Sequence, residues 1–189
     1  MRKWILLAAC GIIAWWGWSY WHDHRFDAVI AAAAQRYQLD PALVKAVVWE
    51  ESRFNPGVRG RVGEMGLMQV RAGVARAWAG TEHLRSFEPE ACFNPATNTL
   101  AGAWYLKKAL HRYGQTDNPV PYALAEYNAG RSNVLKWLDA DSATNSAAFV
   151  GRIGFPSTRL YVMAVMERYE HYRRRLTSGQ VSMANTNSI

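Results

Sequence analysis

Two residue pairs, Asp40-Pro41 and Asn94-Pro95, mark helix starts and constrain the fold of this chain most strongly. In each pair, a side chain that can cap a helix stands before a proline that suits the first helical turn. Apolar residues at helical spacing follow both pairs, and no segment sustains the apolar–polar alternation of a strand. The sequence therefore predicts an all-α fold.

Glycine and proline signals set the remaining helix limits. Gly114 and Gly130 are expected to end two helices, and Asn55-Pro56-Gly57 indicates a loop over residues 53–65. The last residues are small and polar, so a disordered tail is predicted over residues 177–189. The predicted helices cover residues 25–37, 41–52, 66–79, 95–113, 119–128, 132–138, 146–153 and 156–175.

An uncharged segment, residues 4–21, follows Arg2 and Lys3 at the N-terminus. A helix of this length spans roughly 27 Å, which is close to the hydrocarbon thickness of a bilayer. The two basic residues favour a cytoplasmic N-terminus, and the tryptophan and tyrosine side chains near the other end suit a membrane interface. We therefore expect residues 1–24 to form a single-pass transmembrane helix in the inner membrane, with a helical domain, residues 25–176, in the periplasm.

The cysteines leave one alternative to this topology. Residues 7–10 (L-A-A-C) resemble the cleavage motif of a lipoprotein, in which Cys10 would carry the lipid. The apolar stretch before Cys10 is shorter than that of an ordinary signal peptide, and the apolar run continues beyond it, so the anchor is preferred. Cys92 is expected to be a small buried side chain without a disulfide partner.

The formal net charge of +7 favours an anionic partner. The expected export argues against a nucleic acid, and Arg173-Arg174-Arg175 is one basic patch that could meet anionic groups or favour a helix C-terminus. The sequence contains no glycine-rich phosphate loop and no Cys/His set with zinc spacing, and its five histidines are scattered. No metal and no cofactor is predicted, and the sequence does not identify a protein partner.

Two adjacent glutamates lie near the end of the helix that begins at Pro41. On a helical wheel, Glu51 falls within an apolar stripe, while Glu50 lies about a quarter-turn to the side. Burial would raise the pKa of Glu51, as a general acid requires. The alternatives are a helix that ends early, which leaves Glu51 in solvent, or an ion pair with an arginine. The stripe contains Leu43, Val44, Val47 and Val48, and the opposite face contains Lys45 and Ser52.

Four short motifs in order resemble the soluble-type (SLT, family 1) lytic transglycosylases. They are Glu51-Ser52, Gly66-Leu67-Met68-Gln69, Ala125-Glu126-Tyr127-Asn128-Ala129-Gly130 and Thr158-Arg159-Leu160-Tyr161-Val162. The resemblance covers about residues 28–172. It implies a lysozyme-like helical domain that binds peptidoglycan glycan strands. It also implies cleavage of the β-1,4 bond after N-acetylmuramic acid without water, which leaves 1,6-anhydromuramic acid ends.

The resemblance also implies roles for individual residues. Glu51 matches the catalytic acid/base, and Gln69 is expected at the cleft floor. Met68 would form an apolar wall of the cleft, or alternatively part of the core. Tyr127 would hold Glu51 through its hydroxyl. Asn128 would bond an acetamido group or the loop backbone, and Tyr161 would line or support the cleft.

Three positions depart from the family pattern. Gly60 stands where a serine that assists the chemistry is common, Ser157 stands where an acidic residue is frequent, and Glu64 replaces a small residue. A second carboxylate suits a hydrolytic muramidase if it lies about 6.5–9.5 Å from the first with a water between them. The loss of the serine leaves open a catalytically weak wall-binding module. The transglycosylase remains the preferred interpretation.

Overall fold

The computed structural model describes residues 2–186, with side chains at residue 4 and at residues 9–175. All elements in this range are helical, apart from isolated bridges, which confirms the predicted all-α class. The helices are α1 (Arg2–His24), α2 (Asp27–Arg36), α3 (Pro41–Ser52), α4 (Ala72–Thr81), the 3-10 helix η1 (Pro89–Phe93), α5 (Pro95–Arg112), α6 (Pro119–Ala129), α7 (Arg131–Trp137), α8 (Ser146–Arg152) and α9 (Pro156–Thr186).

The two predicted helix starts form as the sequence indicates. The Asp40 side chain accepts a hydrogen bond from the Ala42 N–H at 2.8 Å, and α3 begins with Pro41. The Asn94 side chain accepts hydrogen bonds from the first backbone N–H groups of α5. Because these N–H groups have no partner inside the helix, the side chains satisfy them and fix where each helix begins.

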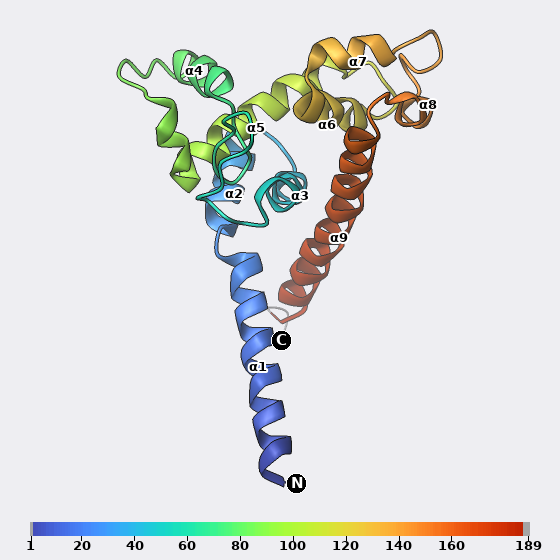
Figure 1. The fold of residues 1–189 in the computed structure, drawn as a ribbon. Helices are drawn as coiled ribbons and strands as arrows, with labels where there is room; N and C mark the ends of the chain where they lie inside the picture. The colour runs from blue at the N-terminus through green and yellow to red at the C-terminus, as the bar shows by residue number, and fades with distance from the viewer. Residues whose placement is uncertain (1, 187–189) are drawn as a thin grey trace.

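Helix α3 lies at the centre of the domain, packed between α2 and α9 (Figure 1). Lys45 and Ser52, which the helical wheel places opposite the apolar stripe, are both buried, and Lys45 lies against Asp27 of α2 and Tyr172 of α9. The Lys45 ammonium pairs with Asp27 at 2.6 Å, and the Ser52 hydroxyl donates to the Val48 carbonyl at 3.0 Å. Neighbouring helices therefore bury α3 on more faces than its apolar stripe alone indicates.

The segment from residue 66 to residue 71 is a loop, and the helix predicted from residue 66 begins only at Ala72. Met65 forms isolated antiparallel bridges with Arg59 and with Val70. The buried Asn98 side chain of α5 donates to the Met65 carbonyl and accepts from the Met68 N–H, each at 2.7 Å. These bonds replace the helical ones, so the backbone need not be helical here.

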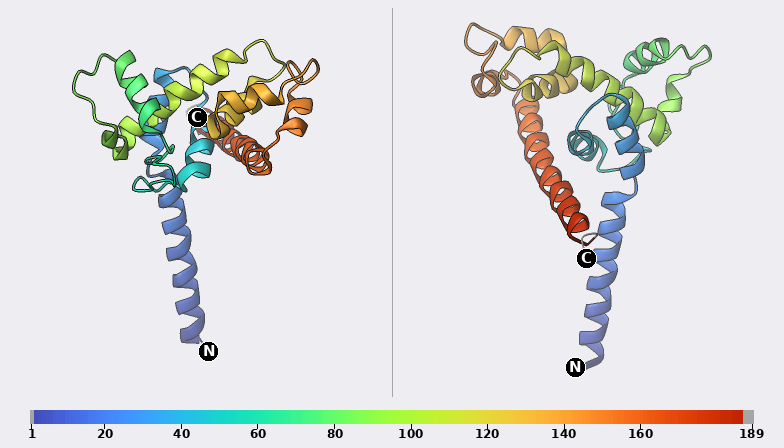
Figure 2. Two further views of the ribbon diagram at one scale, coloured as in Figure 1. Left: turned by 45° about the horizontal axis from the view of Figure 1, so that its top comes forward. Right: turned by 180° about the vertical axis from the view of Figure 1, so that it is seen from behind.

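Helix α1 extends away from the other helices in both views of Figure 2, and large apolar side chains on it are exposed. Its C-terminal end is fixed to the domain by a hydrogen bond from the Tyr172 hydroxyl to Asp23 at 3.0 Å. An edge contact between the His22 and Phe54 rings lies beside it. Within residues 2–186, no helix combines the length and the apolar character needed to cross a membrane.

The C-terminal helix is longer than predicted. Helix α9 continues to Thr186, whereas the sequence predicts its end near Arg175. Residues 187–189 lie outside the described part of the chain. Helix α9 runs back alongside α3 toward the end of α1 (Figure 1), which brings residues far apart in the sequence to one side of the domain.

Candidate active site

A cavity of about 190 Å³ opens beside the C-terminal end of α3. Its walls come from α3, from α4 and the loop before it, from α5 and from α6, so it gathers residues from three of the four sequence motifs. Its lining residues are Glu51, Glu64, Gln69, Val70, Arg71, Val74, Tyr105, Glu126, Tyr127, Asn128 and Gly130.

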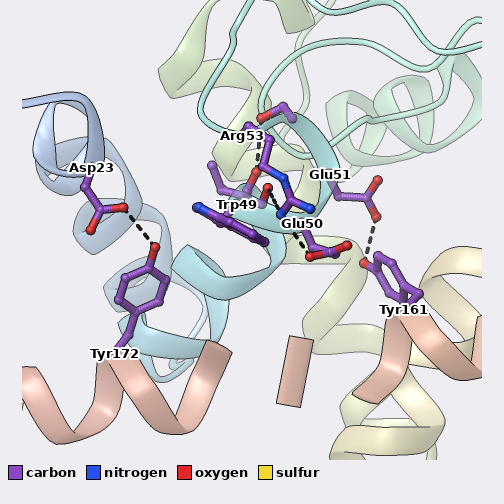
Figure 3. Close-up of polar contacts among 9 residues, drawn as sticks. Asp23, Trp49, Glu50, Glu51, Arg53, Tyr161 and Tyr172 are labelled. Carbon is purple, nitrogen blue, oxygen red and sulfur yellow. Dashed lines mark hydrogen bonds and ion pairs between the residues drawn. The ribbon is translucent and has the colours of Figure 1, made fainter. Parts of the chain in front are cut away.

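Glu51 stands in the last turn of α3 and reaches this cavity. The Tyr161 hydroxyl of α9 donates a hydrogen bond to Glu51 Oε1 at 2.7 Å (Figure 3). Burial raises the pKa of Glu51 to about 7, assisted by the negative charges of Glu50 and Glu64, while the Tyr161 hydrogen bond and the charge of Arg71 lower it. A carboxyl group with this pKa can both give and take a proton near neutral pH.

Glu50 faces a different environment from Glu51 (Figure 3). Its carboxylate pairs with Arg53 at 3.0 Å, and both residues line a separate cavity between α3 and α9. The Trp49 ring lies there between the guanidinium groups of Arg53 and Arg168, at 3.2 and 3.4 Å from the ring centroid. Glu51 and Glu50 thus line two different cavities, as expected from the quarter-turn between them on the helical wheel.

The tyrosine that holds Glu51 is Tyr161 rather than Tyr127. The Tyr127 hydroxyl donates instead to the Met68 carbonyl at 2.8 Å, because α6 packs against the loop that carries Met68. The Met68 side chain is fully buried against Gly102, so it belongs to the core, as the alternative interpretation held. Tyr127 thus supports the cleft loop, and Tyr161 supports the carboxyl group.

Gln69 and Asn128 both line the cavity, as expected for cleft residues. The Gln69 amide donates to the carbonyls of Val58 and Gly66, at 3.1 and 2.9 Å, which fixes the cleft loop. Asn128 accepts a hydrogen bond from the Thr158 hydroxyl at 2.7 Å. This bond joins the third and fourth motifs directly.

Glu64 lies in the cavity wall and contacts a basic residue, Arg71, which was not predicted from the sequence as a site residue. Arg71 Nε donates a hydrogen bond to Glu64 Oε1 at 3.2 Å, and a terminal nitrogen of the same guanidinium forms an ion pair with that oxygen, also at 3.2 Å. The Val62 N–H donates to the other carboxylate oxygen, also at 3.2 Å. The Glu64 carboxylate is therefore held in place inside the cavity rather than extended into solvent.

The cavity contains a third carboxylate, that of Glu126, which was not identified from the sequence as a site residue. It is 1% exposed, it pairs with Arg112, and it accepts a hydrogen bond from the Tyr113 hydroxyl at 2.8 Å. Both oxygens are satisfied by the last residue of α5 and by the residue that follows it, so Glu126 braces α6 against the C-terminal end of α5. Its position directly before Tyr127, inside a motif, was the only sequence signal. Among the described residues, no group of three His, Cys, Asp or Glu side chains could hold a metal ion.

The all-helical domain has a protonatable carboxyl group at the edge of a polar cleft, as expected for the lysozyme-like class that the sequence motifs resemble. Residues 28–150 match the family described as the transglycosylase SLT domain. This match covers more than half of the chain, and the chain belongs to that family.

Relatives with known names agree with this assignment. The soluble lytic murein transglycosylase of Salmonella typhimurium is 29% identical over 191 aligned positions, which cover 98% of this chain and 29% of that protein. The membrane-bound lytic murein transglycosylase F of Desulfosudis oleivorans is 33% identical over 113 positions, which cover 58% of this chain and 23% of that protein. The chain thus spans less than a third of the length of either relative.

A solved structure confirms the fold. The 70 kDa soluble lytic transglycosylase of Escherichia coli superimposes with a TM-score of 0.71 at 28% identity, over 79% of this chain and 24% of that chain. The similarity places the helical domain in the same fold as that enzyme.

Proposed function

We propose that the chain is a peptidoglycan lytic transglycosylase that cleaves the β-1,4 bond between N-acetylmuramic acid and N-acetylglucosamine. The observation that carries this proposal is the position of Glu51, whose carboxyl group lies at the cavity with a pKa of about 7 and a hydrogen bond from Tyr161. One group that can act first as an acid and then as a base is what non-hydrolytic cleavage requires. The names of the relatives support the same reaction and substrate.

Glu51 alone can carry out both proton transfers of this reaction. Protonated Glu51 gives its proton to the glycosidic oxygen as the bond from that oxygen to the anomeric carbon breaks. The 6-hydroxyl oxygen of the same muramoyl sugar then bonds to the anomeric carbon, and its proton returns to the Glu51 carboxylate. The product is a 1,6-anhydromuramoyl end, and the enzyme regains its starting protonation state without a water molecule.

A hydrolytic muramidase is the second candidate, because Glu64 places another carboxylate in the cavity. In that reaction, water rather than the 6-hydroxyl group attacks the anomeric carbon. The ion pair with Arg71 and the hydrogen bond from the Val62 N–H disfavour this role, since they already engage both oxygens of the carboxylate that would have to bind the attacking water.

We also propose that residues 4–21 of α1 attach the protein to the inner membrane and leave the catalytic domain, residues 25–176, in the periplasm. Support comes from Arg2 and Lys3 ahead of this segment, and from the exposed aromatic side chains at its C-terminal end, which suit a membrane interface. Alkaline carbonate extraction of cell membranes tests attachment, and release by carbonate would contradict it. Mass spectrometry of the intact protein would detect the alternative, a chain that begins at lipidated Cys10.

Digestion of purified sacculi by the full chain in detergent tests the activity. Glu51→Gln is expected to abolish release of soluble muropeptides without unfolding the protein, because glutamine cannot transfer the proton. Glu50→Gln, which alters the neighbouring carboxylate that pairs with Arg53, is expected to retain most of the activity. Full activity of the Glu51 variant would exclude the proposed role of this residue.

A further inference from the structure

Gly60 and Glu64 share one region of space in the cavity wall. A Cβ atom on Gly60 would overlap Glu64 Oε2 and would lie 2.8 Å from Gln69 Oε1. The backbone holds the two residues together, because the Gly60 N–H donates to the Glu64 carbonyl at 2.8 Å. The Glu64 carboxylate therefore occupies the volume that a side chain at residue 60 would need.

The carboxylate is fixed there from two directions. Arg71 binds one oxygen, and the Val62 N–H binds the other. The Glu64 side chain is only 17% exposed although it stands on a loop, whereas that of Arg71 is 60% exposed. A mobile ion pair at the surface would contribute little to the electrostatics of the cleft. The Glu64 carboxylate is instead partly buried and fills a defined volume beside Glu51, so its position and its charge are fixed.

We propose that Glu64 is a positioning residue that replaces a side chain at Gly60 and, with Arg71, sets the electrostatic environment of Glu51. This inference rests on the proposed function, and it concerns the same cleft. Negative charge from Glu64 favours the protonated form of Glu51 before cleavage. It also stabilises the positive charge that develops at the anomeric carbon while the glycosidic bond breaks.

Several polar and charged groups surround Glu51. Among them, Glu64 and Arg71 shift the pKa of Glu51 in opposite directions. The groups that face Glu51 are the hydroxyls of Tyr161 and Tyr127, the carboxylates of Glu50 and Glu64, and the guanidinium of Arg71. Glu64 raises the pKa of Glu51, and Arg71 lowers it. Removal of either charge should therefore move the titration of Glu51 in a direction that depends on which charge is removed.

The test is the titration of the Glu51 carboxyl group in the full chain, followed by carbon-13 NMR and assigned with Glu51→Gln. We expect Glu64→Gln to lower the midpoint and Arg71→Gln to raise it, each by on the order of half a pH unit. Matched controls, Glu88→Gln and Arg85→Gln, remove the same charges at exposed sites outside the cavity and should leave the midpoint unchanged. Shifts of the same sign for both cavity variants, or no shift in either, would overturn the proposal.

A steric exchange tests the shared volume independently. Gly60→Ser alone should reduce the cleavage rate at least tenfold, because its side chain overlaps Glu64. The double variant Gly60→Ser/Glu64→Ala should recover most of that loss. If both variants lose activity equally, the two side chains do not compete for space. The proposal that Glu64 replaces a side chain at residue 60 would then be wrong.

The two experiments separate this inference from the proposed function. The NMR titration needs no substrate, so it reports on Glu64 and Arg71 even if the protein cleaves nothing. An inactive wild-type protein with opposite shifts would contradict the transglycosylase activity alone. An active wild-type protein with no shifts would contradict the role of Glu64 alone.

Discussion

Replacement of Glu51 by glutamine should stabilise the folded protein at alkaline pH. The pKa of Glu51 rises from its ordinary value of 4.5 to about 7, chiefly because the carboxyl group is buried. The folded state therefore binds the proton more tightly than the unfolded state does. The favourable contribution of this group is complete below pH 4.5 and is lost as the pH rises through about 7.

The size of the effect follows from the same difference. At about 1.4 kcal/mol for each pH unit, ionisation of Glu51 costs the folded state about 3 kcal/mol above pH 7. Glutamine has nearly the same shape, it stays neutral, and its amide oxygen can still accept the Tyr161 hydrogen bond. Glu51→Gln should thus raise the free energy of unfolding by up to about 3 kcal/mol at pH 8.5 and change it little at pH 4.

Urea unfolding of the full chain in detergent, followed by tryptophan fluorescence at both pH values, measures this difference. Glu88→Gln is the matched control, because it removes an exposed carboxylate outside the cavity and should show no gain that depends on pH. Equal stability of wild type and Glu51→Gln at pH 8.5 would refute the argument that burial disfavours the charged form of Glu51.

Three further substitutions test the supports of the cleft. Tyr161→Phe removes a hydrogen bond that lowers the pKa of Glu51, so the alkaline limb of the pH–rate profile should move upward by about one pH unit, and an unmoved limb would contradict this. Asn98→Ala leaves buried backbone groups of the cleft loop without partners and should lower the free energy of unfolding by about 3 kcal/mol in urea titration. Gly66→Ala should cost at least about 2 kcal/mol in the same assay, because residue 66 has a φ of +69° and a Cβ there would meet Asn98 and the Cys92 carbonyl; wild-type stability would argue against the loop geometry.

The helix starts and the direction of Glu51 could be predicted because both depend on local chemistry. Asp40 and Asn94 cap the helices that follow them, and the position of Glu51 on α3 follows from helical periodicity. The start of α4 could not be predicted, because the loop before it is held by Asn98, which lies about 30 residues further along the chain. Hydrogen bonds from distant side chains leave no periodic pattern in the segment that they hold.

The arrangement of partners around the cleft was less accessible from the sequence. Tyr127 and Tyr161 each stand in a motif, and only the packing of α9 across α3 decides that Tyr161 reaches Glu51. The departures at Gly60 and Glu64 were visible separately. That they fill one volume becomes evident only when the loop folds back on itself.

The most direct test of the central claim is the mass of the muropeptides released from sacculi that are digested in water labelled with oxygen-18. Attack by the 6-hydroxyl group predicts products one water lighter than those with reducing ends, without label at the new end, and none of these products from Glu51→Gln. Labelled reducing ends would show that water attacked the anomeric carbon. That result would contradict the transglycosylase reaction and would make Glu64 the second carboxylate of a hydrolase.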